Sequence, residues 1–235
     1  MVLGLVVLAG AGLAAWWLRP TVTTWPRIAR LRQFFQAPEH YPEWQIQAGA
    51  QCAGAPFLLP TTGYIGFGYG DSWSPGHRHT GLDIFGPTRQ DDPRGLNSTP
   101  IVAAYGGYLT RLPDWKSTVI IRIPNDPLQS GRQIWTYYTH MADPSGQTSY
   151  IVADFPPGTE EVYVEAGTLL GHQGNFSGDA ANPVGVHLHF SIVLDDSQGG
   201  FLNEARIENT LDPSPYLGLR AGVYDDWSEP ILCST

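Results

Sequence analysis

Short runs of β-branched and aromatic residues, each bounded by Gly, Pro, Asn or Asp, are the feature of this sequence that most restricts its fold. Runs of this kind with turn residues between them predict β-strands. No amphipathic helix of normal length interrupts them after residue 60. The 27 Gly, 20 Pro and only 15% charged residues also suit a loop-rich β protein. We therefore expect a mainly antiparallel all-β domain with strands at 100–112, 117–123, 133–140, 161–165 and 186–194.

The last of these predicted strands carries two histidines two positions apart, His187 and His189. Successive side chains on a strand point to opposite faces, so the two imidazoles share one face, and Leu188 and Phe190 share the other. For an isolated His-x-His, two half-exposed polar residues on an amphipathic strand would be the better interpretation. The alternative is half of a metal site, which requires further ligands elsewhere in the chain.

Those ligands are available about a hundred residues upstream, where His79 precedes Asp83 by four positions with Gly81 between them. Glycine allows the backbone to turn tightly at this point. One imidazole and one carboxylate from this segment, together with an imidazole of the strand, give three N/O ligands. Catalytic zinc sites have this composition and leave a fourth position to water. His77, two positions before His79, could compete for the metal.

A His-x-x-x-Asp motif followed far downstream by His-x-His resembles the M23 family of zinc metallopeptidases, the LytM/lysostaphin type. Further blocks agree with this family in order and spacing. They lie at 81–84, 99–107, 138–141, 164–171 and 211–217. The resemblance covers residues 60–217, which is most of the chain.

The resemblance implies the barrel-sandwich hybrid fold and one Zn²⁺ ion held by His79, Asp83 and His189. It also implies that His140 and His187 are catalytic residues that flank the attacking water without binding the metal. For His140 alone, a packed or exposed histidine on a strand would be the better interpretation. Which of the two performs which step stays open. Trp73 and Trp115 are candidates for aromatic walls of the cleft, although a Trp in a β domain is more often in the core.

The function that the resemblance implies is zinc-dependent hydrolysis of peptide bonds in peptidoglycan, in cross-links or in interpeptide bridges. Two non-enzymatic alternatives remain: a LytM-type activator of other wall hydrolases, and a structural envelope protein. The formal net charge of −9 argues against a nucleic-acid partner, which would require a basic face.

Residues 1–18 contain no charged side chain and no Pro, and their length is at the lower limit for crossing a bilayer. We expect a transmembrane anchor, with a cleaved signal peptide as the alternative. Several arginines follow, at positions 19, 27, 30 and 32, and by the positive-inside rule they would keep the domain cytoplasmic. Because the implied substrate is the cell wall, we nevertheless expect an extracytoplasmic domain in the cell envelope.

The expected division of the chain is an anchor at 1–19, a connector or N-terminal arm at 20–59, a metallopeptidase domain at 60–220 and a tail at 221–235. Cys52 and Cys233 lie on opposite sides of the expected catalytic region. In an oxidising compartment such a pair can form a disulfide that joins the two flanks. Two unrelated thiols are the alternative.

Overall fold

The computed structural model describes residues 28–72, 75–220 and 229–234. The predicted anchor at 1–19 and most of the predicted tail at 221–235 lie outside these residues. Within the described part of the chain, no helix combines the length and the apolar character needed to cross a membrane.

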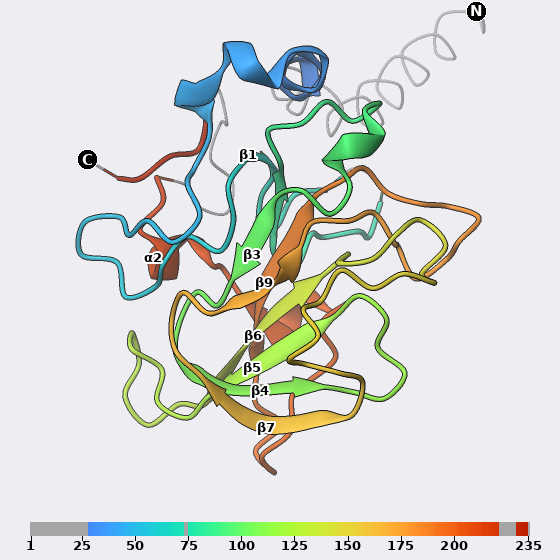
Figure 1. The fold of residues 1–235 in the computed structure, drawn as a ribbon. Coiled ribbons are helices and arrows are strands. Elements are labelled where there is room, and N and C mark those ends of the chain that lie inside the picture. The colour runs from blue at the N-terminus through green and yellow to red at the C-terminus, as the bar shows by residue number, and fades with distance from the viewer. Residues whose placement is uncertain (1–27, 73–74, 221–228, 235) are drawn as a thin grey trace, which may run out of the picture.

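The described residues form a mainly antiparallel β structure with few and short helices, as the sequence predicts (Figure 1). Its main sheet has the strand order β1-β2-β9-β6-β5-β4-β7, and β10 pairs with β9. These strands span Tyr64–Phe67 (β1), Leu82–Phe85 (β2), Gly107–Arg111 (β4), Val119–Ile123 (β5), Ile134–Thr139 (β6), Thr159–Val164 (β7), Leu188–Leu194 (β9) and Thr210–Leu211 (β10).

A second, two-stranded sheet pairs β3 (Pro100–Val102) with β8 (Leu169–His172). In the part of the chain that the structure describes, the helical elements are the helix over 28–36, the α-helix α2 (Ser214–Leu217) and four 3-10 turns. These turns span Pro38–His40, Pro42–Trp44, Pro93–Gly95 and Ile207–Asn209.

The predicted strand at 100–112 is in fact two strands in different sheets. The chain bends at 104–106, so that β3 pairs with β8 and β4 joins the main sheet. At the start of β4 the backbone passes close to its neighbour, and a Cβ atom on Gly107 would lie 2.4 Å from the carbonyl oxygen of Arg122. Glycine at 107 therefore permits the close approach between β4 and β5.

The main sheet does not close into a barrel within the described residues, because its end strands β1 and β7 do not pair with each other. The closed-barrel part of the expected barrel-sandwich hybrid is therefore not found. β1 is covered by side chains of the N-terminal helix, and the middle of β7 is exposed and carries Glu160 and Glu161. Charged residues on an exposed edge strand oppose pairing with another strand.

The two faces of the main sheet have different roles, and β9 shows this most clearly. Leu188, Phe190 and Ile192 are fully buried in the main hydrophobic core. The alternate residues His189 and Ser191 point to the opposite face. This face belongs to the candidate site described below, so the strand that packs the core also fixes the site.

The helix over 28–36 packs its apolar face on β1 and β2, at the end of the molecule opposite β7 (Figure 1). Leu31 and Phe34 are buried against Tyr64 and Phe85. Residues 28–36 of the predicted connector or N-terminal arm therefore lie against the sheet.

Cys52 and Cys233 form a disulfide, as the sequence suggested. Their Cα atoms are 5.3 Å apart, and the cysteines are separated by 181 positions in the sequence. Cys52 is 2% exposed and packs in the main core. The bond therefore joins the segment that leads into β1 to the segment that follows α2.

Candidate metal centre

The register of three neighbouring strands brings Asp83, His189 and Thr139 into one row across the sheet. Asp83 on β2 is opposite His189 on β9, and Thr139 on β6 is opposite His189 on the other side. His79 joins this row from the segment before β2. That segment lies so close to β9 that a Cβ atom on Gly81 would be 2.2 Å from the carbonyl oxygen of Phe190. Glycine at 81 therefore lets His79 reach the row.

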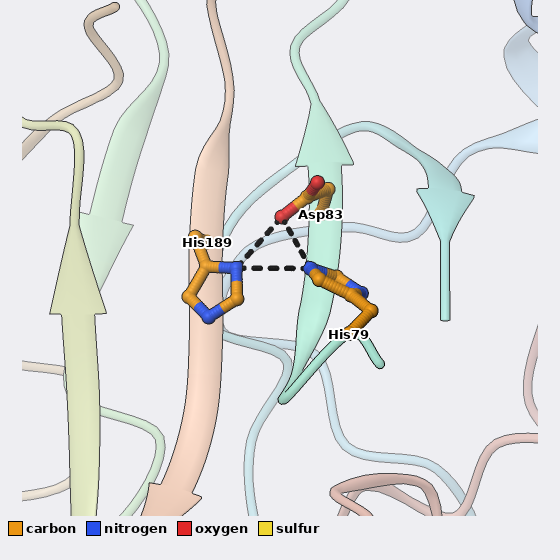
Figure 2. A group of neighbouring side chains, drawn as sticks. All are labelled: His79, Asp83 and His189. Atoms are coloured by element: carbon orange, nitrogen blue, oxygen red, sulfur yellow. Dashed lines mark hydrogen bonds and ion pairs between the residues drawn. The ribbon is translucent and has the colours of Figure 1, made fainter. Parts of the chain in front are cut away.

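The side chains of His79, Asp83 and His189 point at one another (Figure 2). His79 Nε2 lies 3.1 Å from Asp83 Oδ1 and 3.1 Å from His189 Nδ1. His189 Nδ1 lies 2.8 Å from Asp83 Oδ1. All three residues are buried, and together they form a group that could hold a metal ion. His79 and not His77 supplies the first imidazole of this group.

The outer nitrogen of each imidazole in this group faces an acceptor. His79 Nδ1 donates to the carbonyl oxygen of Gly68 at 2.9 Å, and His189 Nε2 donates to Glu204 Oε1 at 2.9 Å. With hydrogens on the outer nitrogens, both imidazoles turn an electron pair towards Asp83 Oδ1 when they are neutral. Two nitrogens and one carboxylate oxygen then converge, which is a donor set typical of zinc.

The charges around this group shift the pKa values of its carboxylates. Burial alone raises the pKa of Asp83, but His79 and His187 hold it well below its usual value. Burial likewise raises the pKa of Glu204, but His189 lowers it to about 2. Both groups are therefore carboxylates at neutral pH. Burial lowers the pKa of His189, but Glu204 and Asp83 together raise it to about 10. The site favours positive charge between its two carboxylates.

His140 and His187, which the resemblance implies to be catalytic, lie beside the group. Their ring centroids are 4.6 Å apart, and His187 Nε2 lies 3.4 Å from Asp83 Oδ1. Each ring donates a hydrogen bond to a backbone carbonyl oxygen. His140 Nδ1 donates to the carbonyl oxygen of Phe176 at 2.7 Å, and His187 Nδ1 donates to that of Gly185 at 2.6 Å. Both rings therefore carry their hydrogen on Nδ1 when neutral and present Nε2 as an acceptor.

His140 has two further unusual properties. It follows β6 with a φ of 76°, a left-handed conformation that is uncommon for a residue other than glycine. The pKa of His140 is lowered to about 3, chiefly by burial and to a smaller extent by the neighbouring His187 and His189. Its imidazole is therefore neutral at neutral pH.

A groove of about 530 Å³ opens onto the site and includes His140 and His189 in its lining. Three aromatic side chains contribute to its walls: Trp115, Tyr137 and Phe176. Asp114 and Lys116 also line it, and they add one charge of each sign. Trp115 also packs against the small cluster around Trp135, so it belongs both to the groove and to the packing of the sheet. Trp73 lies outside the described residues.

Glu204 is the residue of this site that the sequence analysis did not identify. It lies in the segment between β9 and β10 and matches no motif spacing. Only the fold brings it next to His189, and a carboxylate beside a histidine 15 positions away has no distinct sequence signal.

No protein-family model and no curated protein matches the chain. Seven chains of solved structures are similar to it, and they include the following two. One is a protein of Ruminococcus gnavus assigned as a glycyl-glycine endopeptidase, lytM, with 23% identity and a TM-score of 0.36, over 58% of this chain and 45% of that one. The other is a mutant catalytic domain of the prophage-encoded M23 protein EnpA from Enterococcus faecalis. Its identity is 24% and its TM-score 0.36, over 67% of this chain and 96% of that one.

The chain thus spans less than half the length of the first of these proteins.

Proposed function

We propose that the chain is a zinc-dependent endopeptidase that hydrolyses peptide bonds of peptidoglycan. The observation that carries this proposal is the convergence of His79, Asp83 and His189, with His140 and His187 beside them. His140 and His189 also line a groove. A structural metal site normally has four protein ligands, whereas a catalytic one keeps a position open to water. Three converging ligand atoms, with the further imidazoles of His140 and His187 beside them, fit a catalytic metal site.

In this proposal Zn²⁺ would be held by His79 Nε2, Asp83 Oδ1 and His189 Nδ1. When bound, zinc lowers the pKa of a water molecule towards neutrality and polarises a carbonyl group. The carboxylate of Asp83 balances part of the positive charge of the ion. The hydrogen bonds to Gly68 and Glu204 keep the two imidazoles turned towards the ion.

His140 and His187 handle the proton. Both have their Nδ1 hydrogen engaged by a backbone carbonyl oxygen, so each can accept a proton at Nε2. One of them accepts the proton of the attacking water and passes it to the nitrogen of the leaving amine. The other, whose ring lies 4.6 Å away between centroids, would help stabilise the oxyanion that forms on the scissile carbonyl.

The substrate class follows from the M23-type motifs of the sequence, and the groove is compatible with it. An extended peptide offers backbone amides and small side chains, and aromatic walls with few charges can bind such a chain through apolar contact and hydrogen bonds. Residues 60–220 would form the catalytic domain, acting outside the cytoplasm, with residues 1–19 as an anchor or signal segment.

The proposal is tested with the full chain by measuring its zinc content and the release of new amines from purified peptidoglycan. About one zinc per chain, loss of hydrolysis on chelation and recovery on adding zinc would support it. Stoichiometric zinc without amine release, over a panel of wall types, would move the function to binding or scaffolding. A well-folded chain that takes up no zinc would contradict the metal site itself.

Replacing either His140 or His187 by alanine should separate hydrolysis from metal binding. Removal of a general base typically lowers the rate by about 10²–10⁴-fold. Because neither residue belongs to the group of three, zinc content should stay at the wild-type level. The measurements are amine release and elemental analysis on the same samples.

His172→Ala is a matched control, since this histidine lies on β8 and does not line the groove. It should keep both zinc and activity. A His187→Ala and a His140→Ala variant that both hydrolyse peptidoglycan at the wild-type rate would contradict the assigned roles.

A further inference from the structure

Glu204 belongs to no sequence motif, yet its side chain is hydrogen-bonded to residues in and next to the candidate metal centre. Its side chain is 18% exposed, although the segment that carries it lies between β9 and β10 at the surface of the sheet. A carboxylate is rarely removed from water unless it is paired or hydrogen-bonded, because the loss of hydration is costly. Its partners therefore indicate what it does.

One oxygen of Glu204 accepts three hydrogen bonds from three residues, two of them on β9 and one in the segment before β2. Glu204 Oε1 accepts from His189 Nε2 at 2.9 Å, from Thr80 Oγ1 at 2.6 Å and from Ser191 Oγ at 3.0 Å. Thr80 directly follows His79, and Ser191 is on the same face of β9 as His189. The hydrogen bonds from the two hydroxyl groups hold the carboxylate in place. The third hydrogen bond joins this fixed carboxylate to the imidazole of His189.

The bond from His189 Nε2 decides which nitrogen of this ring can act as a ligand. With its hydrogen on Nε2, the neutral ring has its electron pair on Nδ1, which faces Asp83 and His79. The carboxylate lies on the other side of the ring from this nitrogen. Glu204 is also not part of the group of three that could hold a metal ion. It contacts a ligand and is not a ligand itself.

We infer that Glu204 is a positioning residue of the metal centre, which fixes the orientation and tautomer of His189 and makes Nδ1 a stronger donor to the ion. This inference rests on the proposed zinc site. A carboxylate that accepts a hydrogen bond from a metal-bound imidazole polarises that ring and orients it, and its loss typically weakens metal binding by about 10–100-fold.

The test compares the full chain with its Glu204→Ala and Glu204→Gln variants and uses zinc and cobalt as probes. Zinc affinity is measured by competition with a chromophoric chelator, and the absorption spectrum of the Co²⁺ form reports the ligand geometry. Glu204→Ala should bind zinc about 10–100-fold more weakly and change the Co²⁺ spectrum. Glu204→Gln should lie in between, because its amide oxygen can still accept the hydrogen bond but carries no charge.

Glu208→Gln is the matched control, since Glu208 is an exposed carboxylate four residues further on that pairs with Arg206. It should keep the zinc affinity and the Co²⁺ spectrum of the wild type. Circular dichroism of each metal-free variant shows whether the fold is intact. If Glu204→Ala does not fold, Glu204→Gln decides the question alone.

The two proposals fail in different ways. Wild-type zinc affinity and an unchanged Co²⁺ spectrum in the folded Glu204 variants would overturn the role of Glu204 and leave the proposed function standing. A wild-type chain that binds no zinc would overturn both. A loss of thermal stability without any loss of zinc affinity would make Glu204 a purely structural anchor, which also overturns the inference.

Discussion

Asp83→Asn is expected to abolish zinc binding and hydrolysis together. Asp83 supplies the single carboxylate of the group, and its Oδ1 lies within 3.4 Å of a ring nitrogen of His79, His187 and His189. Asparagine has the same shape but no charge, so two imidazoles would be left to hold a divalent cation beside a neutral amide. A bound cation contributes several kcal/mol of charge stabilisation to the reaction, so the rate should fall by about 10³-fold or more.

Elemental analysis and amine release, measured on the same preparation of Asp83→Asn, check this expectation. Asp195→Asn is the matched control, because Asp195 follows the far end of β9 and is hydrogen-bonded to Gln133. The control should keep zinc and activity. Full zinc content in folded Asp83→Asn would contradict the site, whereas loss of both properties in the control would point to a general loss of structure.

Removing the disulfide should have the largest effect on stability. Replacing Cys52 and Cys233 by alanine, or reducing the wild type, frees a loop that spans 181 positions. The unfolded chain then gains conformational freedom, and the loss of a native disulfide typically costs about 2–5 kcal/mol. For a chain of this size that corresponds to a melting temperature lower by about 5–20 °C. Thermal unfolding with and without reductant measures the difference.

Reduction of the double alanine variant provides the control, since it has no bond to break. Its melting temperature should not respond to reductant, and it should match that of the reduced wild type. A wild type that melts at the same temperature in both conditions would show that the bond adds nothing to stability.

The convergence of His79, Asp83 and His189 could be predicted from the sequence because these residues lie on or beside regular strands. The alternation along β9 places His187 and His189 on one side and Leu188 on the other, and a strand cannot change this without moving its apolar residues out of the core. The short spacing between His79 and Asp83 similarly limits where these two side chains can go. The all-β class followed from the same short apolar runs.

What the sequence could not predict depends on contacts between distant segments. β1 and β2 have four residues each and contain or follow glycines, so their apolar pattern is too short to stand out. The predicted strand at 100–112 divides into β3 and β4 because its first half pairs with β8 and its second half pairs with β5 and β7. Glu204 reaches His189 only because the chain returns to β9 through β10, and no residue spacing encodes that return.

The bond between Cys52 and Cys233 also determines what a cut in the backbone would do. A single cleavage at any peptide bond between these cysteines leaves the two fragments covalently linked. The strands on either side of the cut stay at a high effective concentration for each other, so they can remain paired in the sheet. A nicked molecule would migrate as one species in denaturing electrophoresis and separate into two only after reduction. An internal cut between these cysteines is therefore not sufficient by itself to separate the two parts of the sheet.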